Sequence, residues 1–129
     1  MIPPDLRYHQ EHEWVRVQGA QATVGISDFA QDALGDIVFI ELPKIGAVVN
    51  AGQQIGEIES TKTTSTLYTP VSGTIVQVNA HLKDHPEAVN SDPYGQGWMA
   101  VIDLSDAGEV DRLMTAAQYD AFLANQKKG

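Results

Sequence analysis

Apolar and polar residues alternate through the first part of the chain with the period of a β-strand. In residues 13–24 the alternation runs on both sides of Gly19, which predicts a hairpin. Residues 27–35 begin with a capping Ser, carry an acid in the first turn and end in Gly, which predicts a short helix. Residues 36–42 form an apolar run rich in β-branched side chains and closed by Pro43, and we expect a buried strand there.

The middle of the chain reads as a series of short strands. Glycine and proline divide residues 45–78 into short segments, a spacing that suits a β-sandwich or flattened barrel better than alternating β-α units. Residues 79–97 are polar and rich in turn formers, and they predict an ordered surface excursion. Residues 98–102 then return to a strand.

The C-terminal part of the chain has a helical pattern. Two capping-box patterns, from Asp106 to Glu109 and from Thr115 to Gln118, predict two consecutive short helices with an apolar stripe. The length of 129 residues and the mass of 14.0 kDa fit one folding unit. We therefore expect a single domain over residues 1–129, with residues 105–127 as helices packed on it.

Composition excludes several classes of function. The chain has 17 acidic residues against 8 Lys plus Arg, a net charge of −9, so nucleic acid and anionic membranes are not expected partners. No apolar run approaches the roughly 18 residues of a membrane helix, and the first residues do not resemble a targeting signal, so a cytoplasmic location is the default expectation. Because there is no Cys, any redox chemistry must come from an attached group.

Lys62 stands out by its isolation. It is the only Lys or Arg between Lys44 and Lys83, and apolar residues stop at Ile58 and resume at Leu67. Lys62 therefore lies midway through a polar segment joining two strands, where a hairpin turn exposes its amine. Small hydroxyl neighbours leave that amine accessible, and their β-branching stiffens the turn. Most such lysines are solvated surface charges, so the residues alone leave its function open.

Residues 56–62, Gly-Glu-Ile-Glu-Ser-Thr-Lys, are followed by Pro-Val-Ser-Gly-Thr-Ile at residues 70–75. These two segments resemble the lipoylation hairpin of the H-protein family of the glycine cleavage system. Further stretches in the same order, from residues 12–15 to residues 104–106, extend the resemblance over nearly the whole chain. The resemblance implies a mainly β protein, a lipoyl/biotinyl-carrier-like hybrid β-sandwich (flattened barrel) with short peripheral helices, including a C-terminal helical segment.

The same resemblance implies a non-catalytic protein with lipoic acid in amide linkage on Lys62. Its partners would be a lipoate-protein ligase or lipoyltransferase, then glycine decarboxylase, aminomethyltransferase and dihydrolipoamide dehydrogenase. The carrier would be a monomer whose swinging arm takes an aminomethyl group from the decarboxylase to the transferase and is then reoxidised. Tethering gives the dithiolane a high effective concentration at each docked site. The residues expected beside the arm or its cleft are Glu13, Glu59, Ser60, Thr61, Thr63 and Thr66.

Two departures from the family pattern bear on the pathway. The residue four positions after the lysine is commonly Asp, in a polar cleft that holds the loaded amine as a cation, whereas here it is Thr66, beside the retained Glu13. A hydroxyl supplies no charge, and charge-assisted bonds are roughly twice as strong as neutral ones. Thr63 and Thr64 also crowd the turn. Two functions therefore stay open. The chain could serve glycine cleavage, which we favour because that family is commoner, or it could be an H-like lipoate-binding protein of bacterial sulfur oxidation that works with a heterodisulfide-reductase-like complex.

Other readings have weaker support. Biotin could occupy the same lysine, but biotin carriers usually flank it with Met, where this chain has Thr61 and Thr63. An unmodified adaptor protein would carry no group at all. The two histidines and two acids in residues 9–13 lack the spacing of a zinc helix, so we expect no metal. The Gly-Gln-Gly at residues 95–97 lacks a phosphate-binding context, and no catalytic set is suggested.

Overall fold

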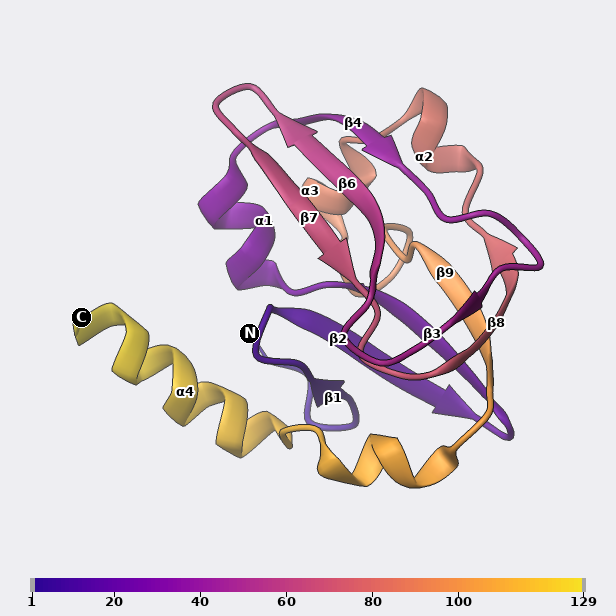
Figure 1. The fold of residues 1–129 in the computed structure, drawn as a ribbon. Helices are drawn as coiled ribbons and strands as arrows, with labels where there is room; N and C mark the ends of the chain where they lie inside the picture. Colours follow the sequence, from indigo (N-terminus) through magenta and orange to yellow (C-terminus); the bar gives the residue numbers. More distant parts are fainter. Residues whose placement is uncertain (1, 129) are drawn as a thin grey trace.

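The computed structural model describes residues 2–128 and arranges them as two antiparallel sheets with short helices beside them (Figure 1). The larger sheet has six strands in the order β1-β2-β3-β9-β8-β5, and the smaller has three in the order β4-β6-β7. In chain order the elements are β1 Arg7–Tyr8, β2 Glu13–Gln18, β3 Gln21–Ile26, α1 Asp28–Leu34, β4 Ile37–Glu41, β5 Val48–Val49, β6 Gln54–Ser60, β7 Thr64–Tyr68, β8 Gly73–Val78, α2 His81–Asp84, α3 Ala88–Ser91, β9 Ala100–Leu104, η1 Ala107–Arg112 and α4 Ala116–Lys128.

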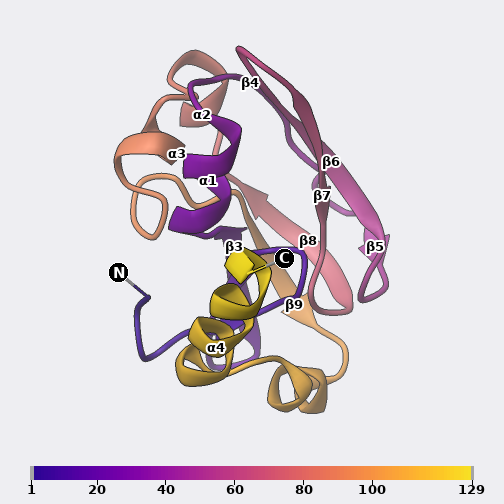
Figure 2. The same ribbon diagram turned by 90° about the vertical axis from the view of Figure 1, so that its left-hand side faces the viewer.

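The helices and the β6–β7 hairpin lie on different sides of the molecule. In Figure 2, α1, α2 and α3 gather on one side and β6 and β7 lie on the other. Both views place the tip of the β6–β7 hairpin at one end and α4 at the opposite end (Figures 1 and 2). The predicted mainly β fold with short peripheral helices is confirmed, and the two sheets are not closed into one barrel. No helix of residues 2–128 combines the length and apolar character needed to cross a membrane.

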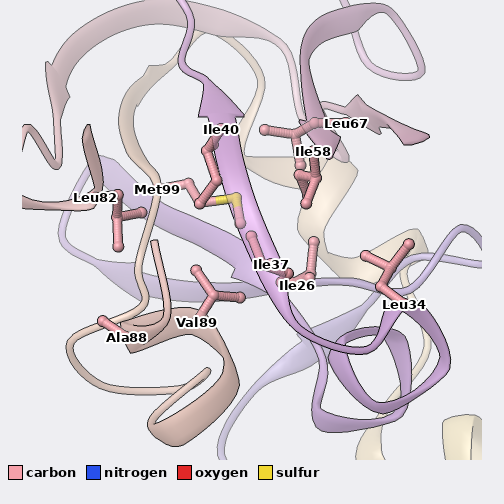
Figure 3. Close-up of a cluster of buried hydrophobic side chains, with 10 residues drawn as sticks. All are labelled: Ile26, Leu34, Ile37, Ile40, Ile58, Leu67, Leu82, Ala88, Val89 and Met99. Carbon is pink, nitrogen blue, oxygen red and sulfur yellow. The ribbon is translucent and has the colours of Figure 1, made fainter. Parts of the chain in front are cut away.

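An apolar cluster joins the small sheet to the helices and to the large sheet (Figure 3). Its isoleucines and leucines are buried, and each such side chain contributes about 1.5–3 kcal/mol when removed from water. This cluster fixes the base of the β6–β7 hairpin, since one buried residue comes from each of its strands. Its members are Ile26, Leu34, Ile37, Ile40, Ile58, Leu67, Leu82, Ala88, Val89 and Met99.

The first predicted hairpin and helix are confirmed. β2 pairs with β3 around Gly19, whose φ of +62° suits a residue without a side chain. The Ser27 Oγ accepts the Ala30 N–H at 3.2 Å and caps α1. The helix ends where the Gly35 N–H donates to the Gln31 carbonyl at 3.0 Å. The local signals that predicted this segment are therefore the ones that hold it.

The strand predicted in residues 36–42 forms as Ile37–Glu41, but the prediction that this strand is buried was wrong. β4 is an edge strand of the small sheet, and only Ile37 and Ile40 are buried. Val38 and Phe39 are 50% and 54% exposed. A β-bulge between Ile37 and Phe39 breaks the alternation of the strand, and nothing in the sequence marks that bulge. An apolar run therefore did not distinguish an edge strand from a central one.

The segment that follows the middle strands also differs from expectation in detail. Two single-turn helices, α2 and α3, lie within the predicted surface excursion. β9 begins at Ala100, so the predicted strand at residues 98–102 starts two residues too early. The Trp98 carbonyl instead accepts from the Asn79 side-chain amide at 2.9 Å. Met99, between Trp98 and β9, still bonds to the backbone, since its N–H donates to the Val24 carbonyl at 2.8 Å.

The two C-terminal capping boxes have different outcomes. The Thr115 N–H donates to Gln118 Oε1 at 2.9 Å and the Gln118 N–H donates to Thr115 Oγ1 at 3.2 Å, which is a complete capping box at the start of α4. The first predicted box does not form, because the Glu109 carboxylate accepts from the Ser72 N–H and hydroxyl at 2.7 and 2.8 Å. The first predicted helix is a 3₁₀ segment, η1, and its cap is the Asp106 carboxylate, which accepts the Gly108 N–H at 3.0 Å.

Candidate functional site

Lys62 lies at the tip of the β6–β7 hairpin, in a turn held by backbone and serine contacts. The Ser60 N–H donates to the Thr63 carbonyl at 2.8 Å and closes the turn. The buried Ser60 Oγ accepts from the N–H groups of Lys62 and Thr63 at 3.3 and 3.1 Å. The Thr61 N–H donates to the Asp36 carbonyl at 3.0 Å and ties the turn to the segment after α1. None of these contacts uses the lysine side chain.

The side chain of Lys62 is exposed and lies beside the end of α1. A methyl group built on Gly35 would lie 3.4 Å from Lys62 Cε, so the aliphatic part of the lysine passes directly over this glycine. Gly35 also has a φ of +80°, a conformation that favours glycine. Among residues 2–128 no carboxylate forms an ion pair with Lys62 Nζ. The structure thus presents a primary amine on a fixed turn.

The other predicted neighbours of the lysine lie on the surface. Thr61 and Thr63 flank it and are exposed. Glu59 is exposed on β6 and pairs in register with Thr64 of β7. Ser60 is the exception, since its side chain is buried under the turn. Ser60 therefore has a structural part in presenting the amine, and the other three are available to a partner.

A polar cleft of about 410 Å³ opens between α1, β2 and β7. Its apolar floor comes from buried side chains of β3, α1 and β6, and its polar wall comes from β7 and the segment before β2. It begins within two residues of Lys62, at Thr64. The lining residues are Glu11, His12, Glu13, Ile26, Phe29, Ala30, Ala33, Leu34, Ile58, Thr64, Ser65, Thr66 and Tyr68.

Glu13 is the buried carboxylate of this cleft, with 1% of its surface exposed. Its Oε1 lies 3.0 Å from His9 Nδ1, and its Oε2 accepts the Tyr68 N–H at 3.1 Å. Burial raises the pKa of Glu13, and the hydrogen bonds with His9 and Tyr68 act in the opposite direction. Glu13 therefore links β2 to β7, the strand that follows the lysine turn.

The structure brings two of the predicted cleft residues together. Glu13 and Thr66 both line the cleft, whereas Glu59, Thr61 and Thr63 are not among its lining residues. Both carboxylate oxygens of Glu13 already have hydrogen-bond partners, Oε1 with His9 Nδ1 and Oε2 with the Tyr68 N–H. A cation in the cleft would therefore meet a shared negative charge from Glu13 and a neutral hydroxyl from Thr66.

The sequence did not predict the residues that support the Glu13 side of the cleft, which we call the Glu13 wall. His9 was weighed only as a metal ligand, and its true partner is the carboxylate of Glu13. His12 adopts a φ of +75°, and its Nδ1 lies 2.8 Å from the Tyr119 hydroxyl, which lies 2.7 Å from Ser27 Oγ. Burial raises the pKa of Tyr119 to about 12, so this hydroxyl stays protonated at neutral pH. No sequence signal joins residues 107 positions apart.

The fold and the site together define a carrier-type domain. A β-sandwich holds one lysine on a short, internally bonded hairpin, with its amine exposed beside a polar cleft. The described residues that surround the amine bond to one another and leave it accessible to another protein.

Comparisons with known proteins name the family. Residues 6–126 match the family described as "Glycine cleavage H-protein". The glycine cleavage system H protein of Bacillus subtilis is 56% identical over 119 residues, 92% of this chain and 94% of that protein. The H protein of Myxococcus xanthus is 54% identical over 124 residues, 96% of each chain. A crystal structure of the H protein from Mycobacterium marinum is 43% identical, with a TM-score of 0.85 and coverage of 93% of this chain and 97% of that one.

The chain belongs to the glycine cleavage H-protein family. The resemblance seen in the sequence is thereby confirmed, and so is the carrier-type fold. The protein is a non-catalytic carrier rather than an enzyme, as its family and relatives indicate.

Proposed function

We propose that this protein carries lipoate in amide linkage on Lys62 and serves glycine cleavage. The observation that carries the proposal is the exposed lysine on a hairpin that holds itself in place, in a chain of the H-protein family. A lysine needs access more than a perturbed pKa, because the modifying enzyme removes the proton from its ammonium. The hydroxyl side chains of Thr61 and Thr63 leave that access open.

The residues around Lys62 fit an attached lipoyl group. In acylation, an activated lipoyl adenylate forms a C–N bond with Nζ, AMP leaves and one proton is released from the amine. The Ser60 contacts keep the turn unchanged when the ammonium charge is lost, since they involve only backbone groups of the turn. The bound dithiolane supplies reversible thiol–disulfide chemistry, which a chain without Cys lacks.

The cleft beside the turn supports a swinging-arm function. Its Glu13 carboxylate and its hydroxyl groups suit a small cationic amine better than an apolar ligand. Glycine decarboxylase, aminomethyltransferase and dihydrolipoamide dehydrogenase are the partners that this function requires. The protein would act as a monomeric single domain, charged by a lipoate-protein ligase or lipoyltransferase in the cytoplasm.

The attachment has a direct test. The purified protein is incubated with a lipoate-protein ligase, lipoate and ATP, and its intact mass is measured before peptide mapping. We expect the mass of one lipoyl group on Lys62. A mass corresponding to biotin in material from the native host, or an unmodified chain there, would contradict the proposal.

A second test separates the two pathways. Thr66 leaves the cleft with one carboxylate fewer than the family pattern, which is the observation that favours sulfur oxidation with a heterodisulfide-reductase-like complex. The names of the relatives favour glycine cleavage. Lipoylated protein mixed with glycine decarboxylase, glycine and labelled bicarbonate should exchange label into glycine. No exchange, with confirmed lipoylation, would leave the sulfur pathway as the better assignment.

A further inference from the structure

Two consecutive apolar side chains on the edge strand β4 are exposed near the lysine turn. Val38 and Phe39 are 50% and 54% exposed, whereas Ile37 and Ile40 on either side are 3% and 4% exposed. The register with β6 shifts between Ile37 and Phe39, which marks a β-bulge. A bulge re-aims side chains that a regular strand would alternate between core and solvent. The fold thus displays apolar surface at this place.

The surface next to this pair is acidic on the side of β6, whereas on its other side Lys44 and Lys83 line a pocket together with Phe39 and Glu41. Glu41 lies directly opposite Glu57, and Phe39 lies opposite Glu59. The three carboxylates are exposed, and like charges at paired strand positions repel each other. Among the side chains that the structure describes, those of residues 2–125, no basic group forms an ion pair with any of them. A positively charged surface would complement this face.

This face lies close to the amine of the lysine turn. Ile37 pairs with Ser60, the last residue of β6, and Lys62 follows two positions later. At roughly 3.3 Å per strand residue, with about 5 Å between strands, Phe39 lies within about 15 Å of the Lys62 Cα. An enzyme that reacts with Nζ must bring its active site to the turn, so its surface also covers the flanks of the turn. An enzyme acting at the far end of a long arm can dock farther away.

We propose that Val38, Phe39, Glu41, Glu57 and Glu59 form a docking face for the enzyme that acylates Lys62. The inference rests on the proposed lipoylation. The matching surface of that enzyme is an apolar recess rimmed by Lys and Arg side chains. The apolar pair at the centre supplies most of the affinity, and the acidic rim speeds association and fixes orientation.

The apolar part is tested with Phe39→Ser, with Val48→Ser as its matched control. Val48 is 75% exposed on β5 of the other sheet. Lipoyl transfer is followed by intact mass with a lipoate-protein ligase, lipoate and ATP at limiting carrier. We expect kcat/KM to fall on the order of tenfold for Phe39→Ser and to stay unchanged for Val48→Ser. Thermal unfolding checks that each variant is folded, and Val38→Ser serves as a second variant of the face.

The acidic part is tested with Glu57→Lys, with Asp111→Lys as the control of equal charge change. Asp111 is exposed on η1, near the opposite end of the molecule from the hairpin tip (Figure 1). We expect Glu57→Lys to slow transfer several-fold at low ionic strength, and the difference to shrink as salt screens the charges. Asp111→Lys should change the rate by less than about twofold.

The choice of partner is tested with Phe39→Ser that has been fully lipoylated by long incubation. Its reduction by dihydrolipoamide dehydrogenase and NADH should match that of the lipoylated wild type. If Phe39→Ser slowed lipoyl transfer and reduction by dihydrolipoamide dehydrogenase equally, the assignment of the face to the acylating enzyme would be overturned. Equal transfer rates for wild type, Phe39→Ser and Glu57→Lys would overturn the docking face while leaving lipoylation intact. A wild-type protein that is never acylated would instead refute the proposed function.

Discussion

The lysine turn and the Glu13 wall hold their polar groups in opposite ways. At the turn, the amine of Lys62 is exposed, and the bonds that fix it come from Ser60 and the backbone. At the wall, the carboxylate of Glu13 is buried, and it makes the bonds itself, to His9 and to the backbone of Tyr68. The Lys62 side chain is available for chemistry because other groups hold the turn in place. The Glu13 side chain instead holds the edge of the cleft in place through its own hydrogen bonds.

This difference predicts that substitutions at Lys62 and at Glu13 have different effects, the first on function and the second on stability. Changing Lys62 should remove a function and spare the fold, because no described contact of the turn depends on its side chain. Changing Glu13 should lower the stability of the fold first. The Tyr68 N–H and the His9 side chain would lose their partner, and a buried polar group without a partner is destabilising. The substitutions below test this division, beginning with the largest expected effect.

Lys62→Arg should abolish acylation completely and leave stability unchanged. The guanidinium keeps the positive charge but does not form the amide. Intact mass after ligase treatment measures the first effect, and urea unfolding measures the second. Lys44→Arg is the control, because Lys44 is another exposed lysine that lies outside the turn. Lipoyl mass on the Lys62→Arg protein, or a clear loss of stability, would contradict the division.

Much of the turn could be predicted from the sequence, because its determinants are local. In the sequence, Lys62 lies in a polar segment between two stretches that contain apolar residues. Those two stretches form the strands Gln54–Ser60 and Thr64–Tyr68. The helix Asp28–Leu34 was predictable for the same reason, since its Ser cap and Gly end act within a few residues. Local rules therefore placed the amine correctly.

The cleft could not be predicted in the same way, because its wall depends on pairings between distant parts of the chain. The Tyr68 N–H meets Glu13 across 55 positions, and Tyr119 meets His12 across 107. Glu109 has the spacing of a capping box, yet Ser72 provides its partners. The bulge in Ile37–Glu41 likewise depends on pairing with β6 rather than on its own residues. Each of these is a tertiary contact overriding a local preference.

Glu13→Ala should lower the free energy of unfolding by about 2–3 kcal/mol. The substitution leaves the Tyr68 N–H without its acceptor and removes the partner of His9 in a largely buried place. Denaturant unfolding monitored by tryptophan fluorescence gives the value. The matched control is Glu11→Ala, an exposed acid two residues away, which should stay within about 0.5 kcal/mol of the wild type. Equal effects at both positions would mean that the Glu13 bonds do not stabilise the wall.

Ser60→Ala should cost less, about 1 kcal/mol, because the turn keeps its backbone bond from Ser60 to Thr63. The variant loses the hydroxyl that accepts from the N–H groups of Lys62 and Thr63. Those groups are near solvent, so water can replace part of the loss. Hydrogen exchange at these two amides should speed up, while Thr61→Ala, an exposed neighbour, should leave it unchanged. Unaltered exchange in Ser60→Ala would show that the backbone alone holds the turn.

The smallest effect concerns pH and the raised pKa of Glu13. Because burial raises the pKa above its ordinary value of 4.5, the folded protein holds this proton more tightly than the unfolded chain. Unfolding therefore releases a proton between pH 4.5 and the raised pKa, and the contribution of Glu13 to stability falls as pH rises through that window.

Glu13→Gln isolates this contribution, since the amide does not titrate. The difference in free energy of unfolding, wild type minus Glu13→Gln, should be greatest below pH 4.5 and should decline to a lower plateau above the raised pKa. Urea unfolding of both proteins from pH 4 to pH 8 measures this difference. A difference that grows with rising pH would mean that the contacts with His9 and Tyr68 outweigh burial. The buried acid would then be stabilised as a carboxylate throughout, and the wall of the cleft would carry a permanent negative charge.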